Sequence, residues 1–153
     1  MSTMLAWAAF VSSIRGNMMH LLLITAALSL GFQATDPTVT VARVYAAFNA
    51  HDAGGFVEQV SEDIRWLTVT RDGVKVETTG REALSKYLAR YFETTPGVSS
   101  RIQSSFFVGS HVAVHERVTW QSPRGERSQS AMAVYEVVNG RITRVWYYDA
   151  VAP

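Results

Sequence analysis

The sequence has no cysteine, almost no excess of charge of either sign, and no apolar run long enough for a permanent membrane span. Without cysteine, the chain can form no disulfide, no zinc–thiolate site and no cysteine nucleophile. Its 14 Lys+Arg and 13 Asp+Glu give a formal net charge of +1, which provides no field to hold nucleic acid or an anionic membrane. We therefore expect neither nucleic acid nor a membrane as a stable partner.

Apolar residues are plentiful by contrast. They make up 48% of the 153 residues, whereas charged residues make up 18%. This balance excludes a disordered chain and favours a well-filled globular interior. The length suits one ordinary domain.

The first 34 residues stand apart because they are almost uncharged. Only Arg15 among the basic residues, and no acidic residue, falls within residues 1–34, and an apolar run extends from Leu21 to Leu30. A lightly basic start, an apolar stretch of about 7–15 residues and a small-residue exit are typical of a secretory signal peptide. We therefore expect residues 1–34 to hold a signal peptide, residues 35–153 to form the folded domain, and the protein to be periplasmic or secreted. The alternative is a cytoplasmic protein with an apolar N-terminal helix.

Residues 35–153 carry helix signals first and strand signals later. Asp36-Pro37 is typical of a helix start, and apolar residues recur at helical spacing along residues 41–48. Asp72-Gly73 between two β-branched runs predicts a hairpin, and residues 79–82, Thr-Gly-Arg-Glu, fit a capping box that begins another helix. The expected helices are residues 37–50, a short one from Asp52 to Val60, and a third one ended by Thr95-Pro96-Gly97; the expected strands are residues 64–69, 74–78, 99–108, 111–121, 127–138 and 141–149.

The last four expected strands follow one another with short turns between them. Gly109-Ser110, residues 122–125 and Asn139-Gly140 are turn signals, so these strands must pair as an antiparallel meander. Three helices against one side of a long antiparallel sheet make an α+β layer fold. If the sheet curls around the helices, a pocket forms between them.

This order of elements and five local strings resemble the nuclear transport factor 2-like superfamily, in particular its SnoaL-like branch. The strings are VARVYAAFNAHD, SEDIRWL, TTGREALSKYL, HVAVHERVTW and YEVVNGRITRVWYYD, and the resemblance covers about residues 37–150. It implies a cone-shaped, curved antiparallel sheet packed on three helices, with a pocket between for a small, largely apolar ligand. It also implies a homodimer formed through the outer face of the sheet. Members include isomerases, cyclases, epoxide hydrolases, dehydratases and non-catalytic binders, so the fold alone does not give the activity.

Ketosteroid isomerases have a similar layout, and their catalytic groups can be compared with this sequence. Their aspartate base corresponds here to Thr68, their tyrosine donor to Val44, and their protonated aspartate to Gln129 or Ser130. Threonine cannot take a proton from carbon at neutral pH. We therefore do not expect isomerase activity by that mechanism.

Alternation along residues 111–121 predicts an acid inside the pocket. The even positions from Val112 to Trp120 are apolar except for Glu116, so the even face should point inward. A carboxyl group in an apolar pocket is prepared for general acid or base catalysis. The alternative is that Glu116 pairs with an arginine and only orders the sheet.

Alternation along the last strand gives two further candidates. With Arg144 on the outer face, Val145, Tyr147 and Asp149 point inward. Asp149 is then a second catalytic acid, with capping or pairing near the chain end as the alternative. Tyr147 is the expected hydrogen-bond donor to the substrate.

The residues expected to line the pocket are mostly apolar or aromatic, as in most small-molecule sites. They are Phe48, Trp66, Thr68, Tyr87, Leu88, Tyr91, Trp120, Met132, Val134 and Val145. Plain core packing is the alternative for the aromatic residues among them. On the opposite face of the sheet, Trp146 and Tyr148 form an aromatic pair that fits the contact of a homodimer.

Metal binding is not expected. His111 and His115 have a spacing that suits one ion on a helix, but on a strand four residues span about 13 Å, too far for both to hold it. No Gly-rich phosphate loop occurs in the sequence. We therefore expect no metal and no organic cofactor.

Together, these patterns predict an exported SnoaL-like domain protein that binds a small, largely apolar molecule. The expected chemistry is cofactor-free acid/base catalysis of the isomerase, cyclase or hydrolase type, with Glu116, Asp149 and Tyr147 as the catalytic residues. The alternative is a non-catalytic ligand-binding or dimeric interaction module.

Export can be tested on the protein isolated from its native host. We expect the mature N-terminus to follow Ser29 or Gly31, because small residues then occupy both positions that signal peptidases require to be small. N-terminal sequencing of periplasmic and culture fractions measures this. An intact chain that begins at Met1 in the cytoplasm would contradict the prediction.

Overall fold

The computed structural model describes residues 36–151, so the expected signal peptide lies outside the described residues. No helix in this range is both long and apolar enough to cross a membrane. The elements in chain order are α1 (Pro37–Asn49), α2 (Ala53–Val57), β1 (Val60–Thr70), β2 (Gly73–Thr79), α3 (Arg81–Thr94), β3 (Ser99–Val108), β4 (His111–Ser122), β5 (Gly125–Val138) and β6 (Arg141–Tyr148).

Two of the helices begin as the sequence predicts. The Asp36 side chain accepts a hydrogen bond from the backbone N–H of Thr38 at 2.9 Å, and Pro37 takes the first position of α1. The Asp52 side chain accepts one from the N–H of Gly55 at 2.8 Å and caps α2. Each carboxylate satisfies a backbone donor that the helix itself leaves unpaired.

The capping box expected for α3 is wrong. Thr79 is still part of β2, where it pairs with Arg65 of β1, so its side chain is not available as the cap. Gly80 is the N-cap, with a φ of 88° that favours glycine, and it makes no side-chain hydrogen bond. Glu82 pairs instead with Lys86, one turn further along the helix, at 2.6 Å.

The six strands form one sheet in the order β2-β1-β6-β5-β4-β3. Strands β3 to β6 make the expected antiparallel meander. One pair departs from the purely antiparallel sheet, because β1 lies parallel to β6. A parallel pair requires a long connection, which here consists of β2, α3 and the first three strands of the meander.

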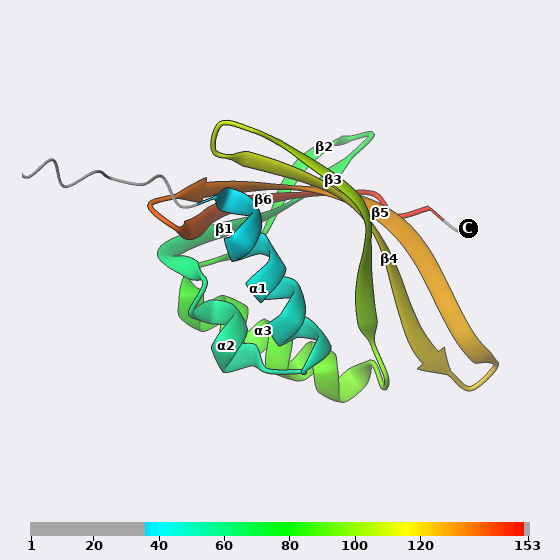
Figure 1. Ribbon diagram of the computed structural model, residues 1–153. Coiled ribbons are helices and arrows are strands. Elements are labelled where there is room, and N and C mark those ends of the chain that lie inside the picture. The colour runs from blue at the N-terminus through cyan, green and yellow to red at the C-terminus, as the bar shows by residue number, and fades with distance from the viewer. Residues whose placement is uncertain (1–35, 152–153) are drawn as a thin grey trace, which may run out of the picture. The chain divides into compact units, whose positions relative to one another are not determined.

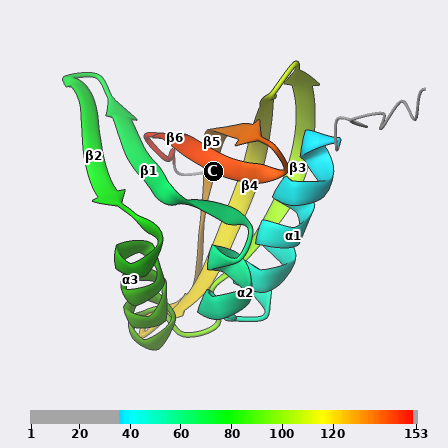
Figure 2. The ribbon, with the colours of Figure 1, turned by 90° about the vertical axis from the view of Figure 1, so that its left-hand side faces the viewer.

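The sheet curves around the helices, as the expected cone requires. Figures 1 and 2 show α1, α2 and α3 on its concave side, with the long strands β4 and β5 bending past them. Register shifts interrupt the pairing between Trp66 and Leu67, between Ile102 and Ser104, and between Glu136 and Val137. Such bulges bend a strand and increase its twist.

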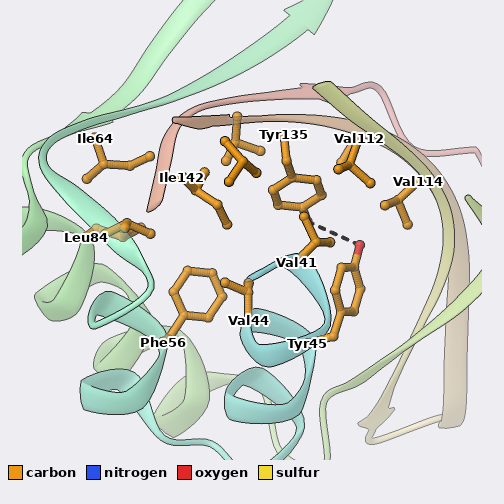
Figure 3. Close-up of a cluster of buried hydrophobic side chains, with 14 of the residues drawn as sticks. Val41, Val44, Tyr45, Phe56, Ile64, Leu84, Val112, Val114, Tyr135 and Ile142 are labelled. Carbon is orange, nitrogen blue, oxygen red and sulfur yellow. Dashed lines mark hydrogen bonds between the residues drawn. The ribbon is translucent and has the colours of Figure 1, made fainter. Parts of the chain in front are cut away.

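The hydrophobic core fills only one end of the space between the helices and the sheet. Its side chains come from all three helices and from the inward face of the sheet (Figure 3), and they include Val41, Val44, Tyr45, Phe56, Ile64, Leu84, Val112, Val114, Tyr135 and Ile142. The phenol of Tyr135 donates a hydrogen bond to the Tyr45 oxygen at 3.2 Å. Further along β4, the inward residues are Glu116 and Val118, which border a cavity instead.

Candidate functional site

A cavity of about 410 Å³ continues from the core toward the open end of the cone. Every helix and every strand contributes to its wall. The residues are Val44, Tyr45, Phe48, Phe56, Trp66, Thr68, Glu77, Thr78, Leu84, Tyr87, Leu88, Tyr91, Ser100, Glu116, Val118, Gln129, Tyr135 and Tyr147. Its size and its mostly apolar wall with a few polar groups are typical of small-molecule sites.

The structure brings most of the expected pocket residues together. The cavity wall includes all six of those expected from the helices and the first strand: Phe48, Trp66, Thr68, Tyr87, Leu88 and Tyr91. Two of the three expected catalytic residues, Glu116 and Tyr147, also lie at the wall.

Four expected pocket residues lie elsewhere. Met132 and Val134 are on the outer face, because the inward positions of β5 are the buried Ala131 and Ala133 next to them. Val145 points inward but belongs to the packed core and is 1% exposed.

Trp120 is the fourth of these residues. It borders a second hollow, together with Arg124 and Arg127, because the β4–β5 hairpin extends beyond the helices (Figure 1). The inward direction of a strand leads to the cavity only where a helix lies opposite.

The expectation that Asp149 points into the pocket is wrong. β6 ends at Tyr148, and Asp149 is exposed. Its backbone N–H donates to the carbonyl oxygen of Val69 at 3.2 Å, whereas its carboxylate does not contribute to the cavity wall. Glu116 therefore stands as the buried acid of this cavity.

Two hydroxyl groups hold the Glu116 carboxylate. Glu116 is 4% exposed; the phenol of Tyr147 donates to its Oε1 at 2.5 Å, and the hydroxyl of Ser100 donates to its Oε2. Within residues 36–151, no lysine, arginine or histidine forms an ion pair with Glu116. The arginine-paired alternative is therefore wrong.

Ser100 is a site residue that the sequence did not reveal. Its backbone is fixed from α1: Asn49 Nδ2 donates to the Ser100 carbonyl at 2.9 Å, and the Ser100 N–H donates to Asn49 Oδ1 at 2.7 Å. This two-bond contact joins the end of α1 to the start of β3. In the sequence, Asn49 is recognisable only as a residue near the end of the first helix. Its hydrogen bonds to the backbone of Ser100 are visible only in the structure.

The tyrosines around Glu116 are held in their neutral form. Burial is the largest cause that raises the pKa of Tyr147, followed by the negative charge of Glu116 and the hydrogen bond to it. Burial likewise raises the pKa values of Tyr45 and Tyr135, with the charge of Glu116 adding to it. The phenols therefore keep their protons at neutral pH and act as hydrogen-bond donors.

The arrangement favours acid/base chemistry. A buried carboxylate borders an apolar cavity, with a protonated phenol in contact with it, and this pair can exchange a proton with a bound molecule. Among the described residues, no cluster of three or more histidine, aspartate or glutamate side chains could hold a metal ion. His111 and His115, on the strand of Glu116, are both exposed and lie on its opposite face.

The comparisons with known proteins agree with this architecture. The family model described as the SnoaL-like domain matches residues 41–145. A cystatin-fold protein from Novosphingobium aromaticivorans is 26% identical, with 73% of this chain and 97% of that chain covered and a TM-score of 0.64. A protein with a ketosteroid isomerase-like fold from Catenulispora acidiphila, solved in complex with trimethylamine, is 18% identical, with 72% and 84% covered and a TM-score of 0.64.

A third structure is an LEH-like epoxide hydrolase from M. tuberculosis. It is 19% identical, with 73% of this chain and 80% of that chain covered and a TM-score of 0.63. No curated protein matches the chain. The likenesses confirm the expected cone-shaped α+β fold.

The buried tyrosines predict a loss of stability in alkali. In the unfolded chain a tyrosine releases its proton near the ordinary pKa of 10.0, whereas Tyr45, Tyr135 and Tyr147 retain theirs in the folded state. Above about pH 10 the folded state therefore binds more protons, and the free energy of unfolding falls by about 1.4 kcal/mol per pH unit for each such tyrosine. Urea unfolding from about pH 9 to about pH 11 measures this slope.

Tyr135→Phe is the matched variant for this experiment. It removes one of the three buried phenols that keep their proton in the folded state. Its free energy of unfolding should therefore fall less steeply with pH than that of the wild type. Equal slopes in the two proteins would contradict the prediction.

Proposed function

The chain belongs to the SnoaL-like domain family of the nuclear transport factor 2-like superfamily, and from this premise we propose that it binds a small, largely apolar molecule on which Glu116 acts as a cofactor-free acid/base catalyst. The observation that carries this proposal is the buried Glu116 carboxylate at the wall of the cavity, held by hydroxyl groups and without an ion-pair partner among the described residues. Its negative charge is therefore available to a bound molecule.

The proposed reaction begins with proton transfer to Glu116. If the carboxylate takes a proton from a carbon atom of the substrate, the electron pair of the C–H bond and its negative charge remain on the substrate. If it takes the proton from a water molecule, the water oxygen bonds to the substrate, and the negative charge passes to the substrate oxygen whose bond is broken or polarised. The protonated Glu116 is a weaker hydrogen-bond acceptor than the carboxylate was. The phenol of Tyr147 therefore donates instead to the substrate oxygen that has become negative. Ser100 keeps the second carboxyl oxygen in place.

The proposed reaction differs from that of the ketosteroid isomerases in the position of the catalytic carboxyl group. The positions that correspond to their catalytic groups are Thr68, Val44 and either Gln129 or Ser130, and none of them carries a group that titrates near neutral pH. Thr68, Val44 and Gln129 line the same cavity. Glu116 enters from β4 instead. A substrate therefore has to present its reacting atom to a different wall of the cone.

The second candidate is a non-catalytic binding protein. Both oxygens of Glu116 already accept a hydroxyl hydrogen bond, an arrangement that can also serve to order the three strands that contribute the groups. Proteins with this fold differ in what they do: one similar structure is an LEH-like epoxide hydrolase, and another was solved in complex with trimethylamine. Ligand binding is common to both candidates, and turnover separates them.

We also propose that the protein is exported and forms a homodimer through the outer face of its sheet. A row of apolar residues crosses this face in register, from β1 to β3: Leu67, Trp146, Val134, Ala113 and Phe106. Phe106 is 68% exposed at the end of the row. Such a row supports a contact between two copies of the chain.

The function can be tested with the compound that copurifies with the protein. We expect native mass spectrometry to detect a bound small molecule in the wild type and not in Thr68→Trp, because the larger side chain occupies the cavity. Ser104→Trp, on the exposed edge strand, is the control and should retain the compound. Equal amounts in the wild type and in Thr68→Trp would contradict binding in this cavity.

Catalysis is tested with Glu116→Gln and the same compound. We expect this variant, when it is saturated with the compound, to convert it about 10²–10⁴-fold more slowly, the usual contribution of a general acid or base. Product formation followed by chromatography measures the rate. Conversion at the wild-type rate would exclude Glu116 as the catalytic acid or base, and the absence of conversion by the wild type would favour the non-catalytic binder.

The dimer can be tested by light scattering after gel filtration. We expect the wild-type mature domain to have the mass of two chains and Trp146→Glu to have the mass of one, because a carboxylate buried within the apolar row costs several kcal/mol. Val39→Glu on α1, away from the sheet face, is the control and should remain a dimer. A monomeric wild type would contradict the proposal.

A further inference from the structure

The cavity carries a negative charge that none of the described residues neutralises. Its wall contains two carboxylates, Glu116 and Glu77, and no lysine, arginine or histidine. Glu77 pairs with Lys75 at 3.0 Å near the exposed rim, whereas both partners of Glu116 are neutral hydroxyl groups. Of the two carboxylates in the cavity wall, Glu116 is therefore the one without a basic partner among the described residues.

The basic neighbours of Glu116 along β4 do not reach it. His115 and Arg117 flank it in the sequence, and alternation places both on the opposite face of the strand, where both are exposed. Arg117 donates instead to the Ser128 hydroxyl at 2.9 Å. A buried ion without a partner of opposite charge is costly, so a cationic ligand gains energy by completing the pair.

Aromatic side chains line much of the same cavity. Trp66 stacks with Tyr147 at a centroid distance of 6.2 Å, and the Tyr147 phenol contacts Glu116. Tyr87 and Tyr91 of α3, which also line the cavity, stack at 6.1 Å. The faces of aromatic rings attract cations, most strongly where water is excluded.

We propose that the ligand or substrate of this cavity carries an alkylated ammonium group, which lies against Glu116 and the aromatic rings. This inference rests on the proposed function that the cavity binds a small molecule. An alkylated ammonium suits the site better than a primary amine because the wall is mostly apolar and aromatic, so it offers the alkyl groups contact surface and the charge the faces of rings. Ligands with a carboxylate or phosphate are disfavoured, since the wall holds no basic side chain.

Three probes of nearly the same shape test the proposal on the mature domain. Choline carries a quaternary nitrogen, 3,3-dimethylbutan-1-ol has a carbon atom in its place, and 3,3-dimethylbutanoate carries a negative charge. We expect choline to bind at least tenfold more tightly than the alcohol, and the anion to bind more weakly than both, as measured by isothermal titration calorimetry or NMR titration.

Glu116→Gln and Glu126→Gln form the matched pair of variants. The first removes the charge in the cavity and should bring choline to within about twofold of the alcohol; the second removes a charge from the exposed β4–β5 hairpin and should retain the preference. Equal binding of choline and the alcohol by the wild type overturns the inference but leaves the proposed small-molecule site in place. Absence of choline binding by the wild type also overturns it, whereas the proposed function is judged separately by the compound that copurifies. The wild-type comparison decides the question even if Glu116→Gln fails to fold.

Discussion

The Glu116 carboxylate is the group on which the site depends. It lies on β4 and accepts one hydroxyl hydrogen bond from the edge strand β3 and one from β6, on the far side of β5. A hydrogen bond to a charged group contributes about 1.5–3 kcal/mol, whereas taking an ion out of water costs several kcal/mol. Because the two donors are neutral, they hold the carboxylate in place and leave its negative charge in the cavity.

The contact between Tyr147 and Glu116 spans a strand, and small residues make this possible. β5 lies between β4 and β6, with Ala131 opposite Glu116 and Ala133 opposite Tyr147. Both alanines are buried and end at Cβ, so the phenol can lie over β5 and reach the carboxylate. A larger side chain at either position would occupy the space that the hydrogen bond crosses. Two small inward residues of β5 thus leave the space that the contact between Tyr147 and Glu116 requires.

The cone-shaped fold provides a cavity, and the polar side chains at the cavity wall determine the chemistry that is possible there. Here the core fills one end, and the other end is an aromatic cavity with a single buried acid. By the resemblance, the positions of the acids in ketosteroid isomerases carry Thr68 and either Gln129 or Ser130 here. The carboxylate of this chain projects from another strand, β4. The proposed chemistry and the proposed ligand class both depend on that position.

The sequence by itself determined the order of the elements, the antiparallel meander, and the inward direction of Glu116, since these follow from local periodicity and turn residues. Only the tertiary structure decided which inward residues border the cavity. Alternation defines two faces of a strand, but the register of β5 made Ala131 and Ala133 the inward residues, and the larger Met132 and Val134 the outer ones.

Residues far apart in the chain also meet only through tertiary structure. Ser100 and Tyr147 converge on Glu116 because the strands are curved and paired in one register, and no local pattern in the sequence records that convergence. Asp149 obeys the same alternation as Tyr147, yet it lies past the end of β6 and is exposed. Periodicity thus gives a side chain its direction, whereas the lengths and packing of the elements determine what it faces.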